Sequence, residues 1–439
     1  MKKTLILAFC VLGLTACSGG DDDPATTGGG NGGNGGSDVT ETVVFGAVFH
    51  DDVSDSAKSR LQAIEMAVSE INASGVFDKT IEVVNLRPTD GDSASADKAA
   101  ERAQELYDDY DAVGVISLFS SLGRAIIGVT NQPEYDFVQC NVSASNPYLN
   151  DSASNTAEEP TDTEDNFYRT VASDFLQGGE MVNIAQAAAW TKVGIYYVDD
   201  AFGNGLKGVL ADGLGDVISS DHVVAFASGE YDIATEASKL DALISAGLDA
   251  IILPTLKESS PFIVDYLTSN NFSGTILLSD GAKTDDIFTA ADSLETWLGT
   301  DGNVMVGTEP NNFAGANSDA FTSAFQAAFS EDPNTYSPTA YDCAMAFAHA
   351  MLKAGGEDRA SIQAGMQSFK VSNLGTDATT VGIGADGLSA AKAVYDAGGS
   401  VDFEGASGRV VFDDTGDRLE LGIRTFSPSL QDGTWGWAY

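Results

Sequence analysis

The chain has 439 residues, of which 65 are Asp or Glu and 22 are Lys or Arg, for a formal net charge of −43 at pH 7. Such an acidic surface repels phosphate backbones and anionic lipid headgroups, which argues against nucleic-acid binding. The length exceeds that of one typical domain, so we expect two lobes.

The amino terminus has the order of a secretory signal. A basic start, MKK, precedes an apolar run from Leu5 to Leu14 that is too short to span a bilayer. The sequence LTAC, ending at Cys17, resembles the bacterial lipobox, in which the chain is cut before the cysteine and its thiol is acylated. We therefore predict a lipoprotein signal peptide over 1–16 and lipidation of Cys17. An ordinary signal peptide with an incidental cysteine is the alternative.

The residues after Cys17 are rich in Gly, Asp, Asn and Thr and bury nothing, so we predict a lipidated, unstructured tether over 17–41. A Gly-rich coil of about 20 residues spans roughly 25 Å, which gives a membrane-attached body its reach. These features predict a cell-envelope protein anchored to a bacterial membrane. Ser18 hints at the outer membrane, but the choice between inner and outer membrane stays open.

Short runs of Val and Ile then alternate with longer amphipathic stretches. Up to residue 140 the pattern predicts strands over 43–49, 81–86, 112–117 and 137–140, and helices over 56–72, 94–107 and 121–130. After an acidic stretch over 150–165, expected to be a loop, it predicts strands over 193–198, 223–227, 250–253 and 275–278, and helices over 176–190, 203–214, 234–246 and 259–270.

This alternation predicts an α/β fold with two doubly wound, Rossmann-like lobes, each a parallel sheet with helices on both faces. Ligands of such sheets bind beyond the carboxyl ends of the strands, so two facing lobes make a cleft.

No motif of catalysis, cofactor binding or metal binding is found. GNGLKG over 203–208 matches a dinucleotide fingerprint, but four residues separate it from the preceding strand, and two of them are acidic. His50, His222 and His349 lie far apart in sequence, so they signal neither a metal site nor a catalytic triad. We therefore expect a binding protein without cofactor or metal, and not an enzyme.

Two cysteines, Cys140 and Cys343, remain in the predicted mature chain. In an exported protein they can form a disulfide or stay as two buried thiols, and the sequence leaves both possibilities open.

The body from Val43 to Tyr439 resembles the type I periplasmic solute-binding proteins of ABC transporters, in particular the branch that binds leucine, isoleucine and valine. The resemblance rests on the order and spacing of AIEMAVSEINASG, AVGVISLFSSLGRA, NVSASNPYL, FYRTVASDFLQGGEM, VGIYYVDDAFGNG, LLSDGAKTDDIF, SPTAYDCAMAFAHAMLKAG and FEGASGRVVFDDTGDR.

The resemblance implies that the chain crosses between lobes three times, near Arg169, Val304 and Leu421. Lobe 1 then comprises 42–170 and 305–420, and lobe 2 comprises 171–304 and 421–439. It also implies a monomer that closes around a small molecule by hinge motion and presents it to an ABC permease in the inner membrane.

The resemblance assigns ligand contacts to five hydroxyl or acidic residues. Ser121, with Ser120 and the free N–H groups of a helix start, matches a carboxylate-binding site, and a plain helix N-cap is the alternative. Ser145 matches a hydroxyl that contacts the ligand, and Ser143 a position whose carbonyl contacts its ammonium group; a turn-stabilising hydroxyl is the alternative for Ser145. Asp280 matches the acidic partner of the ammonium group, with an Asx-turn as its alternative.

Three positions depart from the family pattern. Phe202 stands where relatives carry a ligand-binding tyrosine, and Ser56 and Leu256 stand where they carry aromatic residues. Lys257, beside Leu256, is expected to be a solvated lysine at a helix start. These departures change the expected side-chain pocket, so the resemblance predicts an amino acid or amino-acid-like ligand without specifying leucine.

We therefore expect a lipid-anchored solute-binding protein that captures a small polar metabolite for ABC import. The alternative is a regulatory or structural outer-membrane lipoprotein that binds a protein partner with the same fold, motivated by Ser18 and the missing aromatic residues. A third possibility is a hydrolase, which is supported only by acidic pairs such as Asp413-Asp414.

Overall fold

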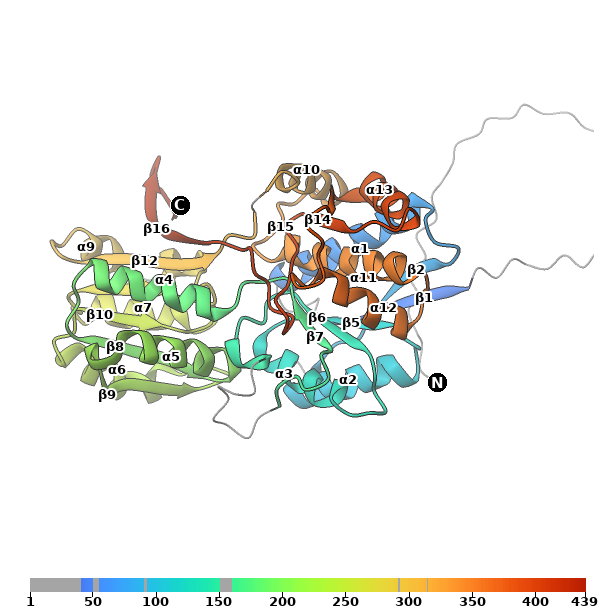
Figure 1. The fold of residues 1–439 in the computed structure, drawn as a ribbon. Helices are drawn as coiled ribbons and strands as arrows, with labels where there is room; N and C mark the ends of the chain where they lie inside the picture. The colour runs from blue at the N-terminus through green and yellow to red at the C-terminus, as the bar shows by residue number, and fades with distance from the viewer. Residues whose placement is uncertain (1–40, 50–54, 91–92, 151–159, 291–292, 314) are drawn as a thin grey trace, which may run out of the picture. The chain divides into compact units, whose positions relative to one another are not determined.

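The computed structural model describes residues 41–49, 55–90, 93–150, 160–290, 293–313 and 315–439 (Figure 1). The predicted signal peptide over 1–16, Cys17 and all but the last residue of the predicted tether over 17–41 lie outside these ranges. Most of the acidic stretch predicted as a loop and the side chain of Ser56 also lie outside the description.

The first sheet has five parallel strands in the order β2-β1-β5-β6-β7. Its strands are β1 Thr42–Val48, β2 Thr80–Asn85, β5 Gly114–Ser117, β6 Val138–Asn141 and β7 Phe167–Arg169. Helices α2 Ala96–Asp108 and α3 Ser120–Thr130 lie on one face, with α1 Asp55–Ser74 and α11 Ser337–Ala354 on the other (Figure 1). A two-stranded ribbon of β3 Thr89–Asp90 and β4 Ser93–Ala94 precedes α2.

Later segments return to this sheet and complete the unit that we call lobe 1. They are the helices α10 Ser318–Phe329, α12 Arg359–Met366 and α13 Gly384–Asp396, and a small sheet of β13 Thr379–Val381, β14 Val401–Gly405 and β15 Gly408–Arg409. Helix α11 is buried along most of its length because it packs against both α1 and α12.

The second sheet, the centre of lobe 2, has the order β17-β16-β12-β11-β10-β8-β9. Its parallel strands are β8 Val193–Asp199, β9 Ile218–Ala227, β10 Ala250–Leu253, β11 Thr275–Leu278 and β12 Val304–Pro310. The strands β16 Ile423–Gln431 and β17 Thr434–Ala438 form an antiparallel edge.

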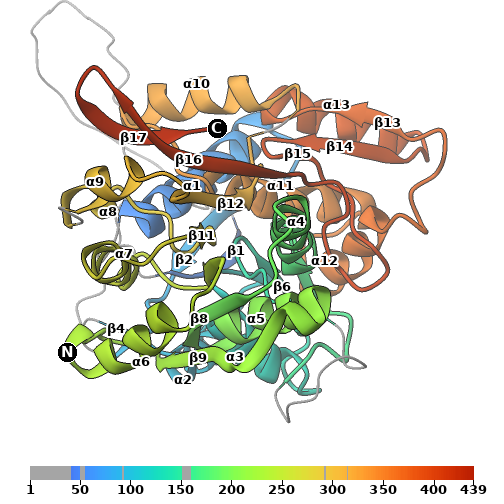
Figure 2. The ribbon, with the colours of Figure 1, turned by 90° about the vertical axis from the view of Figure 1, so that its left-hand side faces the viewer.

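Helices cover both faces of the second sheet, as doubly wound connectivity requires. Figure 2 shows α4 Asp174–Ala187 and α5 Ala201–Leu214 on one face, with α6 Ile233–Ser245 and α7 Ser260–Ser269 on the other. The short helices α8 Asp286–Ala290 and α9 Leu294–Leu298 connect β11 to β12.

Each sheet has its own hydrophobic core. One cluster joins residues between Val43 and Tyr168 with residues between Phe321 and Phe412, and the other joins residues between Met181 and Met305 with Phe426. Two separate cores confirm the predicted architecture of two doubly wound lobes.

One boundary differs from the sequence-based expectation. The crossover expected near Val304 lies after Pro310, because β12 pairs with β11 from Val304 to Gly307 and with β16 from Gly307 to Pro310. The whole of β12 therefore belongs to lobe 2.

The two remaining cysteines form a disulfide, which settles the question that the sequence left open. Cys140 lies in β6 and Cys343 in α11, with their Cα atoms 5.8 Å apart and both side chains buried. The bond attaches the helix of the returning segment to the central region of the first sheet, across a sequence separation of 203 residues.

The first and third crossovers are held together by Arg169, at the end of β7. Its Nε and Nη2 atoms donate to the two carboxylate oxygens of Asp417 at 2.7 and 2.5 Å. Its Nη1 atom donates to the carbonyl oxygens of Ala144 and Asn146, in the loop after β6, at 3.1 and 2.6 Å. The side chain of Arg169 is fully buried, so this bidentate pair supplies charge compensation that water cannot.

Loss of the disulfide is expected to destabilise the protein by about 2–5 kcal/mol, because closing so long a loop restricts the unfolded chain. Urea unfolding of the oxidised protein, compared with the double variant Cys140→Ala, Cys343→Ala, measures the difference. Reductant is expected to destabilise the wild type and leave the double variant unchanged. Equal midpoints for the two proteins would contradict the prediction.

Substitution of Asp417→Ala is expected to cost about 3–5 kcal/mol, because it leaves the buried guanidinium of Arg169 without its anionic partner. Denaturant unfolding provides the measurement. Asp414→Ala serves as the matched control, since it removes an exposed acid from the same turn. Similar losses in both variants would show that the turn, and not the ion pair, sets the stability.

Candidate ligand-binding site

Polar side chains from both lobes meet where the carboxyl ends of the strands approach the crossovers. Lobe 1 contributes Ser143 and Ser145, in the loop after β6, and Tyr336, at the amino end of α11. Lobe 2 contributes Asp280, which follows β11. This grouping contains three of the predicted ligand contacts.

Ser143 is joined to the buried Arg60 of α1. Its hydroxyl oxygen accepts from Nη1 of Arg60 at 3.1 Å and from the backbone N–H of Phe119 at 3.1 Å. The guanidinium carbon of Arg60 lies 5.4 Å from the ring centre of Phe119 and 4.6 Å from that of Tyr336. The hydroxyl of Ser143 therefore positions a cation between two aromatic rings.

Asp280 lies at the junction of the two lobes. The hydroxyl of Tyr336 donates to its Oδ2 atom, while its Oδ1 atom is buried and has no hydrogen-bond partner in the described part of the chain. Burial raises the pKa of Asp280, and the hydrogen bond from Tyr336 and the nearby side chain of Gln177 oppose the rise. One oxygen of this carboxylate is thus open to a donor.

The ring of Phe202 lies against Gly281, the residue that follows Asp280. A Cβ atom on Gly281 would stand 3.0 and 3.2 Å from two ring carbons of Phe202 and 2.7 Å from the carbonyl oxygen of Thr255. Glycine is therefore required directly after Asp280, and the ring forms an apolar wall next to that glycine.

Ser145 lies next to a second buried acid, Asp174, the first residue of α4. The backbone N–H of Asp174 donates to the carbonyl oxygen of Ser145 at 2.7 Å, yet among the described residues neither carboxylate oxygen of Asp174 has a partner in hydrogen-bonding geometry. Burial raises the pKa of Asp174 well above its ordinary value, and the negative charge of Asp280 raises it further. The nearby Ser145 hydroxyl and Arg169 act in the opposite direction.

The remaining two serines are engaged with other groups. Ser120 is buried, and its hydroxyl accepts from the backbone N–H of Asn146 at 3.2 Å. The hydroxyl of Ser121 lies near the carboxylate of Asp200, the N-cap of α5 in lobe 2, and opposes the rise that burial causes in the pKa of Asp200. The N-cap alternative for Ser121 is wrong, since α3 begins at Ser120 and Phe119 occupies the cap position without a capping side chain.

Phe119 adopts φ 58°, ψ 150°, a conformation that costs a residue with a side chain about 1–3 kcal/mol. Such strain persists only where the surroundings enforce it. The hydrogen bond from its N–H to Ser143 and the contact of its ring with Arg60 are two such restraints.

Four polar residues of this region were absent from the sequence-based site: Arg60, Asp174, Gln177 and Tyr336. A signal existed for one of them. Arg60 lies on the apolar face of the first predicted helix, next to Leu61 and Ile64, where a charged residue is unusual.

The described residues also bear on the patterns of a metal site, a membrane-spanning helix and a solvated lysine. None of the described residues forms a cluster of acids, His and Cys suited to a metal ion, and no helix among them is long and apolar enough to cross a membrane. Lys257 is partly exposed, with its Nζ atom 4.0 Å from Glu258, as a solvated lysine would be.

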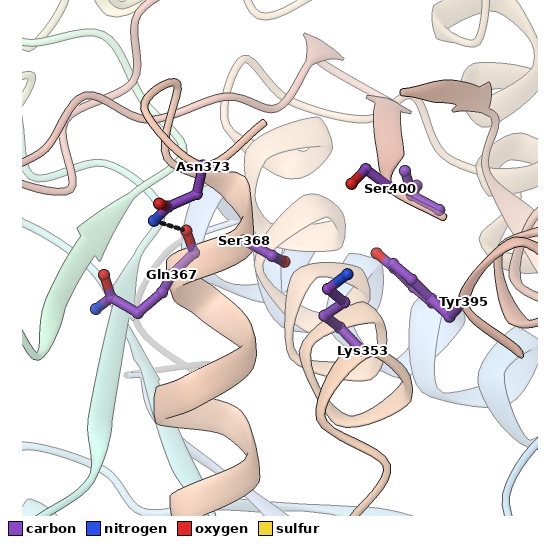
Figure 3. A pocket seen from close by; sticks show the side chains of 7 residues that line it. Lys353, Gln367, Ser368, Asn373, Tyr395 and Ser400 are labelled. Atoms are coloured by element: carbon purple, nitrogen blue, oxygen red, sulfur yellow. Dashed lines mark hydrogen bonds between the residues drawn. The ribbon is translucent and has the colours of Figure 1, made fainter. Parts of the chain in front are cut away.

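A cavity of about 200 Å³ lies elsewhere in lobe 1 (Figure 3). Its lining comprises Lys353, Gln367, Ser368, Asn373, Tyr395, Ser400 and Val401. The amine of Lys353 lies 5.4 Å from the ring centre of Tyr395. None of the residues predicted to contact ligand borders this cavity.

Two α/β lobes that meet over buried, partly unpaired polar groups define a two-lobed ligand-binding protein. Residues 52–414 match the periplasmic binding protein family, and the chain belongs to it. Membership implies an extracytoplasmic location. No curated protein matches the sequence.

Solved structures share the fold at low sequence identity. A leucine-binding protein from Thermotoga maritima is 18% identical, with a TM-score of 0.67 over 90% of this chain and 98% of its own. A type 1 periplasmic binding protein from Bordetella pertussis is 18% identical, with a TM-score of 0.70 over 90% and 99%. A solute-binding protein from R. palustris, solved with benzoate, is 14% identical, with a TM-score of 0.62 over 90% and 94%.

Substitution of Asp174→Asn is expected to stabilise the ligand-free protein at neutral pH. Because burial raises the folded-state pKa of Asp174 above its unfolded-state value, the acid destabilises the fold at neutral pH; the advantage of the variant should shrink as the pH falls through the folded-state pKa and vanish below the range in which an ordinary aspartate titrates. Thermal unfolding as a function of pH measures the difference. Asp212→Asn, on the exposed side of α5, should show no such pH-dependent gain, and equal behaviour of the two variants would refute the assignment.

Proposed function

We propose that this protein is a lipid-anchored, extracytoplasmic solute-binding protein that captures a small amine, an amino acid or amino-acid-like compound, and delivers it to an ABC permease. The observation that carries the proposal is the pair of buried carboxylates, Asp174 and Asp280. Three of their four oxygens have no hydrogen-bond partner among the residues that the structure describes.

An ammonium group complements this pair. Its positive charge offsets the repulsion between the two carboxylates, and its three N–H donors match acceptors that are costly to leave unpaired. The carbonyl oxygen of the Gln177 side chain, one helical turn after Asp174, is a further buried acceptor without a partner in the described chain. A neutral apolar ligand would leave all these groups unsatisfied.

Groups from both lobes surround the proposed ammonium position. Asp174 and Asp280 belong to lobe 2, whereas Ser145 and Tyr336 belong to lobe 1. A ligand that contacts all four favours the closed arrangement over an open one, which is the differential affinity that hinge closure needs. Solved relatives whose ligands are named include proteins in complex with isoleucine, leucine and benzoate.

The proposal is tested by thermal-shift measurements on the chain from Asp38 to Tyr439 with amino acids, amides, polyamines and organic acids. A ligand at about 100 times its dissociation constant should stabilise the protein by about 2.7 kcal/mol. Asp280→Asn should weaken binding of an amine about 10- to 100-fold, through loss of a charge-assisted hydrogen bond. Asp285→Asn, an exposed acid of the same loop, should not.

The affinity should also fall as the pH is lowered, beginning above the range in which an ordinary carboxyl group titrates, because burial raises the pKa of Asp280. A folded protein that responds to no compound of the panel would overturn the proposal. A regulatory lipoprotein that binds a protein partner would then be the better account.

A further inference from the structure

Arg60 is a buried cation without a buried anion bonded to it. Its residue is 5% exposed, and none of the acids in the described ranges lies within ion-pair distance of its guanidinium. One nitrogen, Nη1, donates to Ser143, while Nε is buried and has no hydrogen-bond partner in the described chain. A guanidinium presents its donors as a planar fork, so Ser143 uses one position and another stays open.

The surroundings keep this group charged. Burial lowers the pKa of Arg60 to about 10, with Tyr336 and Asp280 opposing the change, so the side chain remains a cation at neutral pH. The rings of Phe119 and Tyr336 flank it, but an aromatic face compensates a buried charge only in part. The arrangement leaves positive charge unneutralised in the region where the lobes meet.

The serines predicted to hold a ligand carboxylate are less available than this guanidinium. Ser121 lies near the carboxylate of Asp200, which would repel a ligand carboxylate, and Ser120 accepts from the N–H of Asn146. The hydroxyl of Ser145 lies next to the carboxylate of Asp174, which would repel a second carboxylate placed there. No described acid forms an ion pair with Arg60, so its guanidinium is free to pair with a ligand anion.

We propose that Arg60 binds the anionic group of the ligand and thereby selects carboxylate-bearing amines over the corresponding amides. This inference rests on the proposed function, since it assumes that the ammonium end contacts Asp174 and Asp280. The two ends of such a ligand then contact opposite lobes, the anion at α1 of lobe 1 and the cation at α4 and β11 of lobe 2. A compound that lacks either charge leaves one lobe's buried charge unpaired.

The test uses matched pairs of probes that differ only in the acid: leucine with leucinamide, phenylalanine with phenylalaninamide, and glutamate with glutamine. Titration calorimetry and thermal shift are applied to the wild type, Arg60→Gln, Arg60→Lys and Arg359→Gln. Arg359 is the matched control, because it also stacks on an aromatic ring of lobe 1, with its guanidinium carbon 3.6 Å from the ring centre of Tyr107, but outside the proposed site.

We expect the wild type to bind at least one acid about 10- to 100-fold more tightly than its amide. Arg60→Gln should remove this preference, Arg60→Lys should restore part of it, and Arg359→Gln should retain it. Without ligand, Arg60→Gln should unfold at the same or a higher temperature, since it removes an unpaired buried charge, whereas a purely structural arginine would cause a loss.

The two proposals fail in different ways. If amines bind the wild type but acid and amide bind equally, or if Arg60→Gln keeps the preference, the assignment of Arg60 is wrong and the proposed function stands. If no probe binds the folded wild type, the proposed function fails, and the assignment of Arg60 fails with it.

Discussion

The site between the lobes depends on one buried ion pair, Arg169 with Asp417. From the end of β7, the guanidinium of Arg169 contacts two other parts of the chain: the loop after β6 and the turn that precedes β16. The loop after β6 carries Ser143 and Ser145, so the same arginine that fixes the crossovers also fixes the hydroxyls that face Arg60 and Asp174. Guanidinium geometry suits this role because its donors point in fixed directions within one plane.

The electrostatics of the site differ from those of the molecule as a whole. The chain carries 65 acidic residues and 22 basic ones, and an acidic surface is its general property. Among the buried charges without an ion-pair partner, the guanidinium of Arg60 belongs to lobe 1, whereas the carboxylates of Asp174 and Asp280, close enough to affect each other's charge, belong to lobe 2. If the proposed function holds, a zwitterionic ligand would pair with both, and the buried charges would then contribute selectivity as well as affinity.

The two-lobed architecture could be predicted from the sequence, because it depends on the alternation of strand-like and helix-like segments along the chain. Runs of Val and Ile separated by amphipathic segments predicted both sheets, and the observed strands β1, β8 and β10 lie within one residue of their predicted bounds. The crossover after β12 was misplaced, because a strand that continues from one pairing partner to another leaves no change of pattern at Val304.

The site was harder to predict, because its members are brought together by tertiary contacts. Asp280 could be identified from its position after a strand, but its contact with Tyr336 depends on how α11 packs, which local sequence does not encode. For Ser121, local sequence suggested a helix cap, but α3 begins one residue earlier, and the Ser121 hydroxyl lies near Asp200 of the other lobe. The pairing of Cys140 with Cys343 could not be decided from spacing, since both cysteines occur in ordinary apolar segments.

The disulfide also constrains the order in which an exported chain can reach its final state. Cys140 precedes Cys343 by 203 residues, and the strands from β8 to β12 all lie between them. When the amino terminus crosses a membrane first, those strands emerge and can assemble lobe 2 while the first sheet still lacks α11. The crosslink can form only after this helix arrives, so Cys140 cannot reach its final disulfide before residue 343 has crossed the membrane.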